Sequence, residues 1–248
     1  MDPAVLREDM VDSLEHESKG CLDDEQVSLA MRTVEREAFV DDERAAYADR
    51  TLERHGTRVL APSTAARLLD VLAPRPDERA LVVGAGVGYT VAVVAEVVGA
   101  TDTHAIDNNR QLVYEARSNL SAAGYDEVLV DYGDGAEGLA AYAPYDCILL
   151  EAGAVEPPRA LLDQLTPEGR LVMPLGAGTQ TLSVVSKDGT VERHGTVAFQ
   201  PLLVDGESAH EIERNRTHRE DREFARKHAE SRPGWEQDWI DWDDTRRR

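Results

Sequence analysis

Apolar residues recur at helical spacing in several stretches before residue 73, with charged residues between them. This pattern predicts one helix over 3–18 and a second over 23–34, whose first acidic residues act as its cap. An acidic triplet at 41–43 indicates the start of a short third helix. The stretch 49–62 is charged and shows no clear period, so we predict no regular element there. A further helix, capped by Ser63, is expected to run to residue 72 and to end before two prolines.

From residue 80 onward the pattern changes to short continuous apolar runs separated by longer helical stretches. Runs of this kind are typical of strands that are buried on both faces of a parallel sheet. Strands are predicted at 80–83, 103–106, 128–130, 145–151 and 170–174, and helices at 89–98, 109–123 and 157–165. Two later runs, 181–186 and 191–199, flank Asp188-Gly189, which is a strong hairpin signal. We therefore expect an α/β fold, with a mostly parallel sheet and an antiparallel C-terminal hairpin at its edge.

Three glycines, Gly84, Gly86 and Gly88, follow the first predicted strand at alternate positions. Glycines at a turn from strand to helix let the backbone bend sharply and approach a ligand without an intervening Cβ. The next predicted strand is followed by Asp107, whose carboxylate can accept hydrogen bonds from both hydroxyls of a ribose. The alternative is a solvent-facing Asp107 that caps the following helix. Together the glycines and the acid predict a nucleoside-binding βαβ unit.

The spacing of these glycines separates two classes of nucleotide-binding protein. In the dinucleotide fingerprint the third glycine comes one residue later than Gly88 does here, where helix and strand pack. The tighter Gly-x-Gly-x-Gly resembles motif I of the S-adenosylmethionine-dependent methyltransferases, which hold a nucleoside without a pyrophosphate. A nicotinamide-dependent reductase is therefore disfavoured.

A formal net charge of −21 on 248 residues is the unusual feature of the composition. An acidic surface repels nucleic-acid phosphates, so we expect no nucleic acid among the partners. Because the acids are spread along the whole chain, we interpret them as adaptation to a salty cytoplasm rather than as an interaction surface. No apolar run approaches membrane length and the N-terminus lacks a signal pattern, which predicts a cytoplasmic protein without membrane contact. Neither the 2 cysteines nor the 7 histidines show metal-ligand spacing, so no metal is expected.

Three parts are expected along the chain: an N-terminal helical cover with a substrate loop at 1–76, a cofactor-binding domain at 77–205, and a charged helical tail at 206–248. All 3 tryptophans of the chain lie in the tail. Their spacing places Trp235, Trp239 and Trp242 on one helical face. That face either docks on its own domain or binds a partner or a second copy of the chain.

Several motifs between about residue 7 and residue 204 together resemble one family. They include Val83-Gly-Ala-Gly-Val-Gly-Tyr89, Gly133-Asp-Gly135, Ala143-Pro-Tyr-Asp146, Gly169-Arg-Leu-Val-Met-Pro174 and Val197-Ala-Phe-Gln-Pro-Leu202. The chain is similar to the protein-L-isoaspartate O-methyltransferases, and the second and last of these motifs separate that family from other methyltransferases. The resemblance implies a Rossmann-like class I methyltransferase sheet, S-adenosyl-L-methionine as methyl donor, and isoaspartyl residues of damaged proteins as acceptors.

The resemblance also assigns residues to the two halves of a site. The cofactor side comprises Gly84, Gly86, Gly88, Asp107, Asp134 and Gly135. Asp134 is expected near the adenine amino group, although Asp-Gly is also an ordinary turn sequence. Leu60 occupies the position of the family's active-site serine. Glu151 is the first residue of a stretch that usually reads Thr-Ala-Ala in the family. No catalytic residue is therefore assigned. Arg58, Asp49 and Glu151 are candidate substrate-site residues, and Arg58 is expected to offset the charge of Glu151 and to bind a carboxylate.

These residues lead to two hypotheses. The leading one is S-adenosylmethionine-dependent methyl transfer to the carboxylate of L-isoaspartyl residues, which is a protein-repair reaction. The alternative is a divergent member that binds S-adenosylmethionine but methylates another acceptor, or that has lost catalysis and acts as a sensor or scaffold. Leu60 and Glu151 are the features that keep the alternative open.

Overall fold

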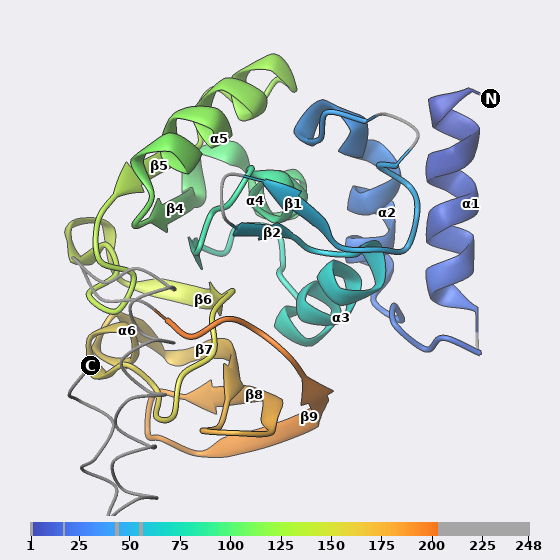
Figure 1. The fold of residues 1–248 in the computed structure, drawn as a ribbon. Coiled ribbons are helices and arrows are strands. Elements are labelled where there is room, and N and C mark those ends of the chain that lie inside the picture. The colour runs from blue at the N-terminus through green and yellow to red at the C-terminus, as the bar shows by residue number, and fades with distance from the viewer. Residues whose placement is uncertain (1, 17, 43–44, 55–56, 203–248) are drawn as a thin grey trace, which may run out of the picture. The chain divides into compact units, whose positions relative to one another are not determined.

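A seven-stranded sheet in the order β5-β4-β3-β6-β7-β8-β9 lies at the centre of the computed structural model (Figure 1). Its strands are β3 (Ala80–Val83), β4 (Thr103–Asp107), β5 (Leu129–Tyr132), β6 (Tyr145–Leu150), β7 (Leu165–Leu175), β8 (Gln180–Ser186) and β9 (Val191–Val197). The strands from β5 to β7 in this order are parallel, whereas β8 and β9 are antiparallel to their neighbours. The structure describes residues 2–16, 18–42, 45–54 and 57–202. The predicted α/β class and antiparallel edge are confirmed.

The helices begin and end close to the positions that the sequence predicts. They are α1 (Pro3–Glu15), α2 (Glu25–Thr33), α3 (Pro62–Leu72), α4 (Tyr89–Val98), α5 (Arg110–Ala122) and α6 (Arg159–Asp163), with short 3-10 helices η1 (Arg36–Phe39), η2 (Ala100–Asp102) and η3 (Ala140–Tyr142). Side-chain caps explain three of these starts, and the first is that of α1, where Asp2 accepts the Ala4 N–H. Asp24 accepts hydrogen bonds from two backbone N–H groups at the start of α2, and Asn109 accepts one at the start of α5.

Alternate residues of the central strands enter two separate cores. In β3, Ala80 and Val82 pack in a core that includes residues of α1 to α5, whereas Leu81 and Val83 pack in a second core with Leu161 of α6. A strand buried on both faces needs apolar side chains at every position, which explains its continuous apolar run. Both cores lie within the single unit Met1–Gly206, which contains all the described residues. The predicted division at residue 76 therefore stays a prediction, and the tail with its tryptophans lies outside the described residues.

Two predictions in the N-terminal part are wrong. No helix follows the acidic triplet at 41–43, because the described residues 45–47 form a turn, and a short helix, η1, precedes the triplet instead. The aperiodic stretch 49–62 contains a two-stranded hairpin of β1 (Leu52–Arg54) and β2 (Thr57–Val59). Strands of three residues are too short to show an alternating pattern, so periodicity could not reveal this hairpin.

Ser63 does not cap α3. The helix begins at Pro62, with Ala61 in the N-cap position and no side-chain hydrogen bond there. The Ser63 N–H instead donates to Asp49 Oδ1 at 3.0 Å, so the acceptor for this helix end comes from 14 residues earlier in the chain. Proline in the first helical turn has no N–H that needs a partner, which makes this start favourable without a local cap.

The boundary between α6 and β7 also differs from the prediction. The helix ends at Asp163, and the strand begins at Leu165 rather than at residue 170. Leu165 pairs with Tyr145 of β6, and a register shift follows before the regular parallel ladder begins. Pairing with a neighbouring strand therefore extends β7 into a stretch whose own sequence, with a proline and a glycine, does not indicate a strand.

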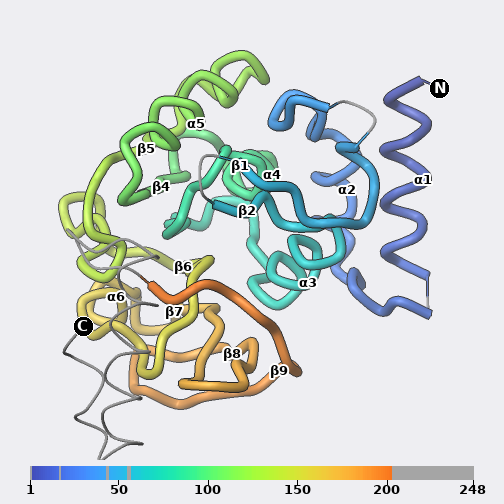
Figure 2. Tube along the Cα trace, viewed as in Figure 1, coloured from blue at the N-terminus to red at the C-terminus, as the bar shows by residue number. Residues whose placement is uncertain are grey.

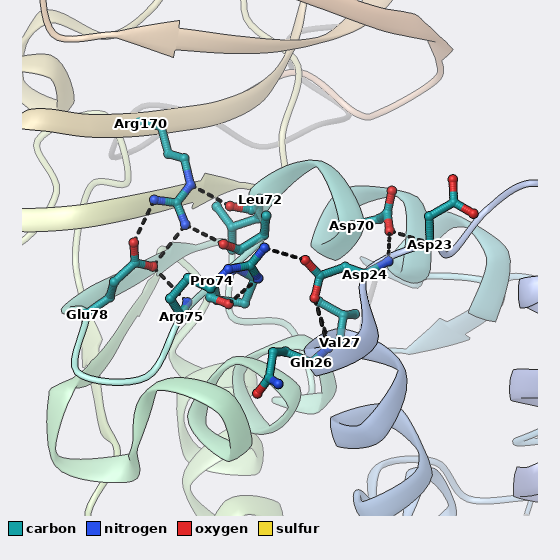
Figure 3. A network of polar contacts seen from close by, with 11 residues as sticks. Asp23, Asp24, Gln26, Val27, Asp70, Leu72, Pro74, Arg75, Glu78 and Arg170 are labelled. Carbon is teal, nitrogen blue, oxygen red and sulfur yellow. Dashed lines mark hydrogen bonds and ion pairs between the residues drawn. The ribbon is translucent and has the colours of Figure 1, made fainter.

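Arg170 of β7 connects the sheet to the end of α3 through a network of polar contacts (Figure 3). It donates to the two carboxylate oxygens of Glu78 at 2.8 and 2.9 Å, and to two carbonyls at the C-terminal end of α3. Burial alone would lower the pKa of Arg170, but the Glu78 carboxylate outweighs burial and raises it. Arg75, whose backbone N–H donates to Glu78, extends the network to Asp24 at the start of α2.

Removing this arginine is expected to destabilise the fold. Arg170→Met should lower the free energy of unfolding by about 2 kcal/mol, because Glu78 and two helix-end carbonyls lose their donors. Calorimetry should show this loss as a decrease in Tm of about 4–8 °C. Arg159→Met is the matched control, because the Arg159 side chain is 92% exposed and surface ion pairs contribute little. Equal Tm values for the two variants would contradict the role assigned to Arg170.

Candidate active site

The glycine-rich turn lies between the C-terminal end of β3 and the start of α4. Gly84, Gly86 and Gly88 have φ angles of +90°, +53° and +97°, which side chains other than glycine rarely adopt. Gly88 also packs closely, because a Cβ there would lie 3.3 Å from the Leu120 side chain and 3.5 Å from Ala116 on α5. The alternating glycines are therefore needed for the shape of this turn.

Asp107, the last residue of β4, holds the glycine turn in place. Its Oδ2 accepts a hydrogen bond from the Gly86 N–H at 3.0 Å, and its Oδ1 accepts one from the Asn109 N–H at 2.8 Å. Burial raises the pKa of Asp107, although these backbone hydrogen bonds oppose the shift. The side chain is 7% exposed, so it does not face solvent. The backbone N–H of Asn108 also contacts this carboxylate. A carboxylate has about four lone-pair sites, so acceptor capacity remains for a ribose hydroxyl.

The segment Gly133–Gly135 packs against the same end of the sheet. A Cβ at Gly135 would lie 2.6 Å from Val83 Cγ1, so only glycine fits there without movement. Asp134 Oδ1 accepts the Ala136 N–H at 2.8 Å, which is a turn-forming contact. The structure thus places Gly135 against the last residue of β3, which the glycine turn follows, while the contact of Asp134 with adenine stays a prediction.

A pocket opens where the β1–β2 hairpin meets the glycine turn. Its lining residues come from η1, β2 and the residue after it, the glycine turn, α4 and the end of β6: Arg36, Arg58, Val59, Leu60, Ala85, Gly86, Val87, Tyr89, Thr90 and Glu151. Figure 2 traces the chain from η1 through the hairpin into α3. The fold therefore brings together Arg58, Leu60 and Glu151, as the sequence analysis expects of a substrate site.

Asp49, the remaining candidate, is not among the residues that line this pocket. Its carboxylate accepts the Ser63 N–H and forms an ion pair with Lys19 at 2.9 Å. Burial alone would raise the pKa of Asp49, but the bonds from Ser63 and Lys19 outweigh it and lower the pKa. In this structure Asp49 anchors the start of α3, and direct contact with substrate stays a prediction.

Arg36 is a pocket residue that the sequence analysis does not include. Its side chain is 1% exposed, and it donates to the Ala46 carbonyl at 2.7 Å and the Leu60 carbonyl at 2.6 Å. The guanidinium lies 4.4 Å from the centroid of the Tyr89 ring, a cation–π contact. Burial lowers the pKa of Arg36 even though Tyr89 opposes this shift. Within the described part of the chain, Nη1 has no hydrogen-bond partner.

Glu151 follows β6 directly and reaches the same pocket. Its backbone N–H donates to the Val83 carbonyl at 2.8 Å, which fixes the residue beside the end of β3. Burial raises the pKa of Glu151 to about 7, Thr90 opposes this shift through a hydrogen bond, and the Asp107 charge adds to it. The buried Oε1 has no hydrogen-bond partner among the described residues.

Comparison with known proteins shows to which family the chain belongs. Residues 6–208 match the family model described as protein-L-isoaspartate(D-aspartate) O-methyltransferase. This chain belongs to that family. The protein-L-isoaspartate O-methyltransferase of Methanopyrus kandleri is 42% identical over 208 residues, which cover 79% of this chain and 91% of the relative. The enzyme of the same name from Methanothrix thermoacetophila is 40% identical over 185 residues, or 72% of this chain and 88% of that one.

A solved structure gives the same picture of the fold. A Plasmodium falciparum chain, assigned to the protein-L-isoaspartate O-methyltransferases and crystallised in complex with S-adenosyl-L-homocysteine, superposes with a TM-score of 0.72. The match covers 79% of this chain and 98% of that one at 23% sequence identity. The predicted family and the predicted class I methyltransferase sheet are both confirmed.

The pocket residues that sequence reasoning missed gave only weak local signals. Arg36 is a single cation between Val34 and Phe39, both buried, and Thr90 lies in the first turn of an apolar helix. Neither type of position indicates a pocket by itself, because the partners come from distant parts of the chain.

Among the described residues, no group of 3 or more histidine, cysteine, aspartate or glutamate side chains is placed to hold a metal ion. No helix in that part is long and apolar enough to cross a membrane.

Proposed function

We propose that this protein transfers a methyl group from S-adenosyl-L-methionine to the free carboxylate of L-isoaspartyl residues in damaged proteins. Membership of the family supports the reaction and the acceptor class. One structural observation supports it independently of the family. The pocket lined by Arg58, Leu60 and Glu151 lies directly against Gly86 of the turn assigned to the cofactor, so an acceptor and a donor would meet there.

The residues of the glycine turn fit the proposed cofactor. Gly84, Gly86 and Gly88 adopt positive φ without a Cβ, and Asp107 has acceptor capacity beside them. When bound, S-adenosylmethionine supplies an electrophilic methyl group on a positively charged sulfur. Asp134 and Gly135, on the adjacent segment, are proposed to border the adenine. This arrangement is consistent with nucleoside binding at the C-terminal edge of a parallel sheet, next to its central strand.

The protein itself has little chemistry to perform. A carboxylate acceptor is already ionised near neutral pH, so its oxygen needs no general base. The rate then depends on holding this oxygen in line with the methyl group at close range. Arg36 and Arg58 give the pocket positive charge that attracts a carboxylate. Leu60 contributes apolar surface only, so orientation must come from the other residues of the pocket.

The test is transfer of labelled methyl groups to an isoaspartyl peptide. We expect base-labile label in the isoaspartyl peptide and none in the aspartyl peptide of the same sequence, because only in the first does the backbone run through the β-carbonyl and leave the α-carboxylate free. Calorimetry with S-adenosyl-L-homocysteine accompanies the assay. Cofactor binding without transfer would favour the sensor or scaffold reading, and absence of both would overturn the proposal.

Three further points belong to this proposal. The net charge of −21 supports adaptation to high salt, so activity should be higher in about 2 M than in about 0.1 M KCl, where repulsion between surface acids is less screened. A cytoplasmic location is also proposed, on the sequence pattern described above. Docking or dimerisation through Trp235, Trp239 and Trp242 also stays a proposal, and the oligomeric state in solution tests it.

A further inference from the structure

Three buried polar atoms of the pocket residues lack hydrogen-bond partners within the described residues. They are Nη1 of Arg36, the hydroxyl of Tyr89 and Oε1 of Glu151. All three side chains line the same pocket, together with Arg58 and Leu60. An unpaired buried polar atom costs free energy, roughly 1–3 kcal/mol for a neutral group and more for a charged one. A ligand that supplies partners for Arg36 Nη1 and Glu151 Oε1 would therefore gain affinity from this pocket.

The charges of the pocket restrict the chemistry of that ligand. The nearest charged or titratable groups come from four elements: Arg36 on η1, Arg58 on β2, Tyr89 on α4 and Asp107 on β4. The two arginines favour an anion, whereas an ionised Glu151 would repel one. A carboxylate ligand resolves this conflict only if the glutamate carries a proton. It then accepts one hydrogen bond from Arg36 Nη1 and a second from the Glu151 O–H.

We propose that Glu151, in its protonated form, donates a hydrogen bond to the carboxylate of the methyl acceptor, and that ionisation of Glu151 weakens acceptor binding. This inference rests on the proposed function, because it concerns the acceptor carboxylate of that reaction. It gives Glu151 the orienting role that Leu60 cannot perform, since leucine has no hydrogen-bonding side chain. It also makes acceptor binding depend on pH.

The direction of the pH dependence follows from the environment of Glu151. Burial raises its pKa to about 7, the Asp107 charge adds to the shift, and the Thr90 hydrogen bond opposes it. The carboxyl is therefore mostly neutral at pH 6 and mostly ionised at pH 8. The acceptor carboxylate itself stays ionised over this whole range. Affinity for the acceptor should decrease as the pH rises through about 7.

The experiment measures KM for an isoaspartyl peptide between pH 6 and 8, with the cofactor saturating. The unmodified protein should show a KM about tenfold higher at pH 8 than at pH 6, as expected for a required proton with a pKa near 7. Glu151→Gln, whose amide donates at both pH values, should show a nearly constant KM. Glu156→Gln, an exposed position on the following loop, is the matched control and should keep the tenfold change.

Binding without turnover helps to distinguish failure of this inference from failure of the proposed function. Peptide binding to the protein loaded with S-adenosyl-L-homocysteine, measured by calorimetry, should show the same tenfold loss of affinity without any turnover. Equal pH dependence in the unmodified protein and in Glu151→Gln would overturn the inference, while methyl transfer itself would remain intact. Absence of transfer at every pH in both proteins would instead overturn the proposed function.

Stability provides a control that does not depend on substrate. A glutamate with a raised pKa binds more protons in the folded than in the unfolded state between about pH 4.5 and 7, so stability decreases with rising pH in that range. Glu151→Gln removes this penalty. Its Tm relative to the unmodified protein should therefore increase from pH 5 to pH 8. A constant Tm difference would contradict the buried position of Glu151, and Glu151→Thr gives a second variant without a titrating group.

Discussion

Replacing Asp107 with alanine is expected to weaken the binding of S-adenosyl-L-homocysteine by at least about 100-fold, which corresponds to about 3 kcal/mol. The variant removes the acceptor for the backbone N–H groups of Gly86, Asn108 and Asn109. A hydrogen bond to a charged acceptor contributes about 1.5–3 kcal/mol. Without these bonds the glycine turn loses its fixed shape, and the proposed ribose contacts are lost as well.

Isothermal titration calorimetry gives the dissociation constant directly. Asp131→Ala is the matched control, because this aspartate lies on the neighbouring strand β5 and its side chain is 51% exposed. That control should change the affinity by less than about twofold, as expected for a surface position. Asp107→Asn keeps an acceptor oxygen without the charge and should give an intermediate loss. An affinity for Asp107→Ala equal to that of the control would refute the role of Asp107 in the turn.

A side chain at Gly135 is expected to disturb both the fold and the cofactor side of the site. A Cβ there would lie 2.6 Å from Val83 Cγ1, closer than packed atoms tolerate, and 3.4 Å from Leu202 Cδ1. Gly135→Val adds two more carbon atoms and should destabilise the protein by about 3 kcal/mol, the upper range for overpacking. This loss corresponds to a decrease in Tm of about 6–12 °C. Since Val83 precedes the glycine turn, cofactor affinity should decrease as well.

The control for this variant is another glycine without steric constraint. A Cβ at Gly178 would meet no atom within 4 Å, and its φ is not positive, so Gly178→Val should leave Tm nearly unchanged. Differential scanning calorimetry of the two variants isolates the steric effect at Gly135. A Tm for Gly135→Val within about 2 °C of that of the control would show that the sheet end adapts easily, contrary to close packing in protein interiors.

The glycine turn and the acid beside it could be predicted from local sequence, while their contact with the cofactor stays a prediction. The glycines and Asp107 lie within one βαβ unit, and each has a conformational or chemical reason to be there that a short stretch reveals. The structure adds that Asp107 also holds the turn through the Gly86 N–H. That contact joins two residues 21 positions apart, so the sequence pattern suggests the proximity but not the bond.

The acceptor side could be predicted only in part. Arg58, Leu60 and Glu151 are identified because they replace or border residues that the family resemblance assigns. Arg36 and the hairpin of β1 and β2 are not, because a buried arginine and two three-residue strands have no distinctive periodicity. For Asp49 the structure adds a contact that the sequence does not indicate, and its role at the substrate site stays a prediction. Its position next to the substrate loop indicates a site residue, yet its carboxylate is occupied by Ser63 and Lys19.

By itself, the sequence determined the α/β class, the family, the glycine turn and the placement of an acid beside it. These features depend on short-range periodicity, backbone conformation and turn chemistry, which neighbouring residues encode. Only the tertiary structure decided that Arg36 and Glu151 face one pocket and that both carry unpaired buried atoms. It also decided that the Glu151 carboxyl holds its proton to about pH 7. Burial and long-range contacts set these properties, because the desolvation of a charge depends on every chain segment packed around it.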